Sequence, residues 1–175
     1  MRGAVAILAL LALSGCGALV PSYREADAPI SSIATFDAER YTGLWYEGAS
    51  YPTFCERGCT DTTAVYELIA PGTISVLNSC ARDGGISRIS GEARLVGPGR
   101  FKLRLDGVPV EADYWVLWVD EGYRTAVVGS PSGGSGFILN REPDIPADRL
   151  TAARQVLAFN GYELDDLKMT EQGGR

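Results

Sequence analysis

Cysteines are the residues of this chain best suited to covalent chemistry, and they occur at Cys16, Cys55, Cys59 and Cys80. The chain contains no histidine, so an imidazole can neither activate a serine or cysteine nucleophile nor ligate a metal. No carboxylate is recognisably paired with Cys55 as its base. We therefore expect no enzyme activity, no metal site and no cofactor, and we keep a Cys55-dependent thiol enzyme as an alternative.

Cys16 lies at the end of a segment typical of protein export. Arg2 and the apolar run 4–13 have the charged start and short apolar core of a secretory signal, and the run is too short to span a membrane. The sequence Leu-Ser-Gly-Cys at 13–16 resembles the lipobox of bacterial lipoproteins. That resemblance implies a signal peptide over residues 1–15 and acylation of Cys16, with palmitate among the chains. Gly17, in the position where Asp would retain an enteric-type lipoprotein in the inner membrane, favours the outer membrane.

The segment that follows Cys16 has the composition of a tether. Residues 18–35 are rich in Pro, Ser and Ala with mixed charge, and they show neither helical nor alternating periodicity. We expect residues 16–35 to form a lipidated, flexible tether whose last part packs across one end of the domain. The folded domain would then face the periplasm.

Short strands separated by turns account for most of the remaining chain. Twenty-one Gly and nine Pro are spread between apolar runs, as in an all-β domain. The expected strands are the one around Trp45 and those at 60–68, 73–80, 87–96, 100–105, 114–119, 123–129 and 136–141. Eight antiparallel up-and-down strands can close into a barrel that holds one small ligand. A helix at about 146–159, with Leu150, Ala153, Val156 and Leu157 on one face, is expected to pack outside it.

The hairpin at 60–80 indicates a disulfide. Cys59 and Cys80 flank it at nearly equal distances from the turn at Pro71, within bridging range across adjacent strands. The pairing is offset by one residue, so we expect a bulge near Cys59. A Cys55–Cys59 bond is the alternative; otherwise Cys55 is left as a free thiol.

Three short motifs resemble the signatures of the lipocalin family. They are Gly43 with Trp45 in FDAERYTGLWYE at 36–47, Asp120 with Tyr123, and Arg141 at the end of FILNR. The resemblance covers about 36–172 and is strongest to the bacterial outer-membrane lipoprotein branch, with the apolipoprotein D type next. It implies a lipocalin calyx in which Arg141 stacks on Trp45 and closes the barrel base.

The same resemblance implies a ligand site inside the barrel. The residues that correspond to lining positions are Tyr66, Val76, Asn78, Arg82, Tyr114 and Phe137. Aromatic and aliphatic side chains would hold an acyl chain, while Arg82, Asn78 or Tyr114 would meet a carboxylate or phosphate near the mouth. A filled barrel without a cavity, in a structural envelope lipoprotein, is the competing interpretation.

The net charge and the expected membrane anchor limit the classes of partner that this chain can bind. The net charge of −6 and the absence of a basic run argue against nucleic acid as a partner. We expect a lipocalin that is anchored to the membrane through acylated Cys16. It would bind or transport a fatty acid, lysophospholipid or similar lipid in envelope maintenance or stress. A homodimer is also compatible with the sequence.

Overall fold

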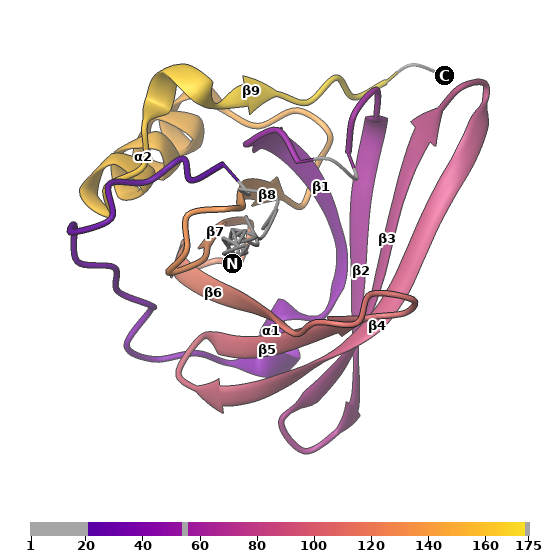
Figure 1. The fold of residues 1–175 in the computed structure, drawn as a ribbon, viewed down its shortest axis with the longest axis horizontal. Helices are drawn as coiled ribbons and strands as arrows, with labels where there is room; N and C mark the ends of the chain where they lie inside the picture. Colours follow the sequence, from indigo (N-terminus) through magenta and orange to yellow (C-terminus); the bar gives the residue numbers. More distant parts are fainter. Residues whose placement is uncertain (1–20, 54–55, 174–175) are drawn as a thin grey trace, which may run out of the picture.

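The strands form one closed antiparallel barrel (Figure 1). The structure is a computed structural model that describes residues 21–53 and 56–173, so the predictions for Cys16 and Cys55 lie outside the described residues. Each strand pairs with the next, and β1 closes the barrel by pairing with both β2 and β8. The strands are β1 (Gly43–Ser50), β2 (Thr60–Ala70), β3 (Thr73–Arg82), β4 (Gly85–Gly97), β5 (Arg100–Leu105), β6 (Ala112–Val119), β7 (Thr125–Gly129) and β8 (Gly136–Asn140).

The two ends of the barrel differ. At the end where β1 begins, which we call the closed end, the short helix α1 (Ala38–Tyr41) starts at Asp37, whose carboxylate accepts from the Glu39 and Arg40 amides. Tyr41 of this helix and the preceding Phe36 belong to the cluster of side chains that fills the barrel there. The opposite end, which we call the mouth, carries the β1–β2, β3–β4, β5–β6 and β7–β8 connections.

A second apolar layer covers one side of the barrel. Helix α2 (Ala147–Phe159) buries Ala153 and Leu157 against the outward faces of Val127 and Ile138, and Figure 1 shows it outside the barrel beside β7 and β8. The predicted helix and its apolar face are confirmed. No helix within the described residues is both long and apolar enough to cross a membrane.

The C-terminal segment fills a gap between β1 and β2 near the mouth. Direct pairing of these strands ends at Tyr46 and Thr63. A short 3-10 turn, η1 (Leu164–Asp166), leads into β9 (Lys168–Met169), which pairs with Ala49 and Ser50. The Gln172 side-chain amide then donates to backbone oxygens on both β1 and β2 at 2.9 Å. Residues 168–173 therefore act as part of the barrel wall.

The N-terminal segment is more ordered than the expected tether. Residues 21–35 run along the barrel, where Tyr23 donates to the Gly133 oxygen and Ile33 to the Val116 oxygen, both at 2.9 Å. The Arg24 guanidinium is buried and donates to the carbonyls of Ala28, Pro131 and Asn160. Hydrogen bonds therefore hold the described part of this segment against the barrel.

Candidate functional site

The closed end is sealed by a cation–π pair and a set of backbone hydrogen bonds. Trp45 is fully buried, and the Arg141 guanidinium carbon lies 3.7 Å from its ring centroid, as predicted. The same guanidinium donates to the backbone oxygens of Arg40, Thr42, Leu44 and Tyr123. Gly43 leaves room for it, since a Cβ at that position would lie 3.3 Å from the Arg141 Nη1. Arg141 thus ties α1, β1 and the β6–β7 turn together.

Asp120 fixes the β6–β7 turn at the same end. Its carboxylate accepts from the Thr125 amide at 2.8 Å, from the Arg124 amide and from the Arg124 Nε. Burial alone would raise the pKa of Asp120, but these hydrogen bonds and the neighbouring guanidinium bring it below its usual value. Asp120 is therefore an ionised structural residue of the closed end.

Three tyrosines form the floor of the barrel interior above this seal. The Tyr114 hydroxyl oxygen lies 2.7 Å from that of Tyr41 and 2.9 Å from that of Tyr66, and the rings of Tyr41 and Tyr66 stack with centroids 5.4 Å apart. Burial raises the pKa of Tyr66 to about 12 and that of Tyr41 and Tyr114 well above the usual value. All three phenols are therefore neutral hydrogen-bonding groups in the physiological range.

Above the tyrosine floor the inward-facing side chains are only partly buried. Strand register places Asn78 opposite Ile89, Leu103 opposite Ala112, and Phe137 opposite Val128, with all these side chains inside the barrel. Partly exposed inward residues above the floor include Asn78, Ile89, Leu103, Leu105 and Phe137. Solvent thus reaches an interior wall made mostly of aliphatic and aromatic groups, which suits a small hydrophobic ligand.

A polar cluster lies where this interior meets the gap between β1 and β2. The buried Glu47 carboxylate accepts from the Thr170 hydroxyl at 2.5 Å, and burial raises its pKa despite that hydrogen bond. Burial and the Glu47 carboxylate together raise the pKa of Glu56 to about 7, although the Thr53 hydroxyl donates to it at 2.6 Å. The Thr62 hydroxyl nearby on β2 is buried without a hydrogen-bond partner among the described residues.

We expect Glu56 to make the stability of the fold depend on pH. A carboxyl whose pKa is higher in the folded than in the unfolded state stabilises the fold at acid pH. That contribution is lost as the pH rises through about 7. Wild type should lose stability between about pH 5 and pH 8, and Glu56→Gln should lose less, because only the raised pKa of Glu47 then contributes. Urea unfolding at both pH values measures this, and an identical pH dependence in the two proteins would show that Glu56 is not responsible.

The disulfide joins Cys59 to Cys80 near the mouth, with Cα atoms 5.4 Å apart. The predicted pairing is confirmed, and so is the expected bulge. Thr60 pairs with Ala81 but Thr63 pairs with Ser79, so β2 carries one extra residue there. Asp61, at this irregularity, has a positive φ of 50°. The bond therefore staples the mouth ends of β2 and β3.

The structure distributes the six predicted ligand residues over three levels. Tyr66 and Val76 are buried toward the closed end, Asn78 and Phe137 face the partly open interior, and Arg82 lies at the mouth, where β3 ends. Tyr114 was expected near the mouth, but its hydrogen bonds place it in the floor. It therefore cannot share a ligand headgroup with Arg82.

Sequence reasoning missed several residues of the interior. Leu103 and Leu105 follow Phe101 at a spacing of two on β5, so strict alternation in that strand could have identified them. Tyr41 was assigned only to a helical turn. No local pattern marks Glu47, whose burial depends on Thr170 from the far end of the chain.

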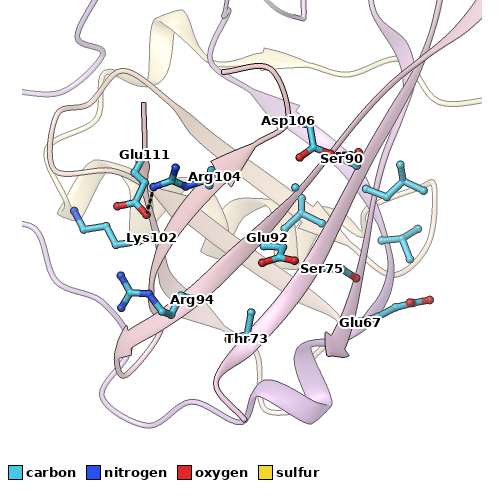
Figure 2. A pocket seen from close by; sticks show the side chains of 14 residues that line it. Glu67, Thr73, Ser75, Ser90, Glu92, Arg94, Lys102, Arg104, Asp106 and Glu111 are labelled. Atoms are coloured by element: carbon cyan, nitrogen blue, oxygen red, sulfur yellow. Dashed lines mark hydrogen bonds and ion pairs between the residues drawn. The ribbon is translucent and has the colours of Figure 1, made fainter. Parts of the chain in front are cut away.

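A depression on the outer face of β2–β5 is separate from this interior (Figure 2). It has a volume of about 790 Å³ and is lined mostly by outward-facing residues such as Glu67, Glu92 and Lys102. Of the predicted ligand residues only Val76 borders it. Some of its charged groups have partners, since Arg104 forms an ion pair with Glu111 at 3.3 Å and the Ser90 hydroxyl donates to the Asp106 carboxylate at 2.6 Å. This polar surface does not suit an apolar ligand.

This chain combines three features: a closed base, an up-and-down barrel of eight strands and an external C-terminal helix. Together they define a class of single-domain β-barrels with one accessible interior. A family model for a lipocalin-like domain matches residues 36–172. The chain belongs to the lipocalin family, and the predicted fold and family are confirmed.

Several relatives align with most of this chain. Temperature-induced lipocalin-1 of Arabidopsis thaliana is 34% identical over 147 residues, which cover 78% of this chain and 79% of that protein. Outer membrane lipoprotein Blc of Escherichia coli (strain K12) is 30% identical over 174 residues, covering 96% and 98%. Bovine apolipoprotein D is 30% identical over 147 residues, covering 78% and 77%. Among solved structures, insecticyanin from Manduca sexta has a TM-score of 0.68 at 18% identity, covering 88% of each chain, which shows the shared fold.

Proposed function

We propose that this lipocalin is an acyl-anchored envelope protein that binds a single-chain lipid, such as a fatty acid or lysophospholipid, inside its barrel. One observation carries the proposal. Ile89, Leu103, Leu105 and Phe137, which face the interior above the tyrosine floor, are apolar and only partly buried, whereas Tyr41, Tyr66, Val76 and Ala93 toward the closed end are buried. An acyl chain would bury these exposed groups, each methylene contributing about 0.8 kcal/mol.

The polar groups near the mouth suit a lipid headgroup. Arg82 at the end of β3 supplies a cation for a carboxylate or phosphate. The Thr62 hydroxyl, which has no hydrogen-bond partner in the part of the chain that the structure describes, supplies a donor and an acceptor. We propose that the headgroup lies at this level and the chain extends toward the tyrosine floor. The protein would then act by binding and transfer of lipid rather than by catalysis.

Anchoring rests on the lipobox-like sequence that ends at Cys16, and the match to Outer membrane lipoprotein Blc over 96% of this chain supports it. We propose that Cys16 is acylated in the outer membrane, with the domain in the periplasm. Multiple acyl chains would make that attachment stable. Envelope maintenance or stress is the expected setting, and homodimer formation is compatible with it.

The binding proposal is tested with two leucines on opposite faces of the sheet. Leu105 faces the interior near the mouth, whereas Leu77 faces outward and is 38% exposed. Leu105→Glu should weaken palmitate binding by about tenfold or more because the acyl chain would bury a charge. Leu77→Glu should change it less than about twofold. Titration with palmitate and with lysophosphatidylcholine measures both effects, and equal affinities for the two variants would refute an interior site.

A further inference from the structure

The point at which the chain joins the folded domain lies beside the mouth of the barrel. The Tyr23 amide donates to the Gly133 oxygen in the β7–β8 connection at 2.9 Å, and its hydroxyl donates to the Pro52 oxygen after β1 at 2.6 Å. The Tyr23 ring also stacks on Tyr51 with centroids 5.1 Å apart. Residues of two mouth connections therefore fix Tyr23 in place.

A buried arginine reinforces this attachment from the other side. The Arg24 Nε donates to the Asn160 oxygen at 2.7 Å, at the C-terminal end of α2, where the helix dipole favours a cation. The Glu25 amide donates to the Gly161 oxygen, and the Glu163 amide donates to the Tyr23 oxygen, each at 2.9 Å. The segment cannot leave the mouth without losing all of these interactions.

Chain length then limits how the domain can sit on a membrane. Five residue steps separate Cys16 from Pro21, and fully extended they span at most about 18 Å. Strand β2 has 11 residues, so at about 3.3 Å per residue and a tilt of about 40° the barrel is roughly 28 Å tall. The link is therefore too short to pass along the barrel and bring the closed end to the lipid surface.

We propose that the barrel mouth faces the membrane and is held within about 20 Å of its surface, so that a lipid can pass directly between bilayer and barrel. This inference rests on the anchoring at Cys16 proposed above. Exposed apolar side chains occur at the mouth-side end of the molecule, with Phe159 82% exposed at the end of α2 and Val110 65% exposed in the β5–β6 connection. Ile69, 50% exposed at the closed end, shows that apolar exposure alone does not select an end. The attachment of residues 22–25 beside the mouth is what selects the end of the barrel that faces the membrane.

Charge does not supply the attraction. The net charge of −6 disfavours an anionic lipid surface, and acidic Asp83 and Asp106 lie at the mouth together with Arg82 and Arg88. The mouth therefore contacts the apolar and interfacial zone of the bilayer rather than charged headgroups. The short link makes this contact possible because it keeps the mouth at a high local concentration beside the bilayer.

The test uses full-length, acylated protein in phosphatidylcholine vesicles that contain a lipid brominated on its acyl chain. Three single variants each place a tryptophan on an exposed apolar position: Phe159→Trp and Val110→Trp at the mouth side, and Ile69→Trp at the closed end. Quenching beyond that of the parent protein, whose three native tryptophans are common to all variants, is expected for Phe159→Trp and Val110→Trp and not for Ile69→Trp. Each variant should retain the parent's circular dichroism, since these side chains are exposed.

The outcomes separate anchoring from orientation. Flotation with vesicles that is abolished by Cys16→Ala, together with quenching of both Phe159→Trp and Val110→Trp but not of Ile69→Trp, supports the proposal. Flotation with quenching of Ile69→Trp, of only one mouth-side variant, or of none of the three overturns the orientation and leaves the anchor intact. Protein that does not float overturns the anchor and the orientation with it.

Discussion

Replacing Trp45 by alanine is expected to lower the free energy of unfolding by about 3–5 kcal/mol. Trp45 is fully buried, its indole nitrogen donates to the Tyr41 backbone carbonyl oxygen at 2.8 Å, and Arg141 stacks on its ring. The substitution leaves a cavity at the closed end and removes the surface that Arg141 covers. Urea unfolding followed by circular dichroism measures the loss.

Trp115 provides a matched control for this change. An arginine also stacks on its ring, since the Arg100 guanidinium carbon lies 4.5 Å from the Trp115 ring centroid, but Trp115 is only partly buried. Trp115→Ala should therefore cost about 1–2 kcal/mol. Equal losses for the two variants would contradict the view that the closed end depends on Trp45.

The second large effect is expected at Gly91, where β4 pairs with both β3 and β5. A Cβ at this position would lie 2.2 Å from the Arg104 oxygen and 2.9 Å from the Leu105 Cα. Both contacts are with backbone, so no side-chain rotation can relieve them. Gly91→Ala should therefore lower the free energy of unfolding by about 3 kcal/mol or more. It should also weaken lipid binding because it displaces Leu105.

Gly85→Ala is the control in the same strand. The nearest atom to its Cβ would be the Arg82 oxygen at 3.9 Å, and its φ is not in the left-handed region. Its stability should change by less than about 0.5 kcal/mol. If Gly91→Ala were as stable as Gly85→Ala in urea, the close approach of β4 and β5 would not be a constraint on the fold.

Local sequence signals predicted the barrel well because turns and alternation set its strands. Pro71-Gly72 and Gly97-Pro98-Gly99 end strands where the structure ends them, and the position of Cys80 relative to Cys59 indicated both the disulfide and the bulge. The Trp45 and Arg141 pair followed from family resemblance, since nothing local connects residues almost a hundred positions apart.

Interactions between distant segments account for what was missed. Arg24 binds carbonyls more than a hundred residues away, so composition alone indicated a flexible tether where the chain is fixed. Glu47 and the C-terminal segment likewise meet only in the folded molecule. Gly91 carries no turn motif, and its importance depends on how closely β5 approaches. Tyr114 was assigned to the mouth because the sequence identified its strand but could not show how far from the mouth the side chain lies.

Native mass spectrometry tests most directly whether the barrel interior holds a lipid. The chain from Ala18 onward, purified without detergent, should carry one single-chain lipid that is lost on denaturation and delipidation. After refolding, it should take up added palmitate or lysophosphatidylcholine with a stoichiometry of one. A clean unliganded mass, with no uptake of either lipid, would contradict an interior lipid site and favour a filled barrel.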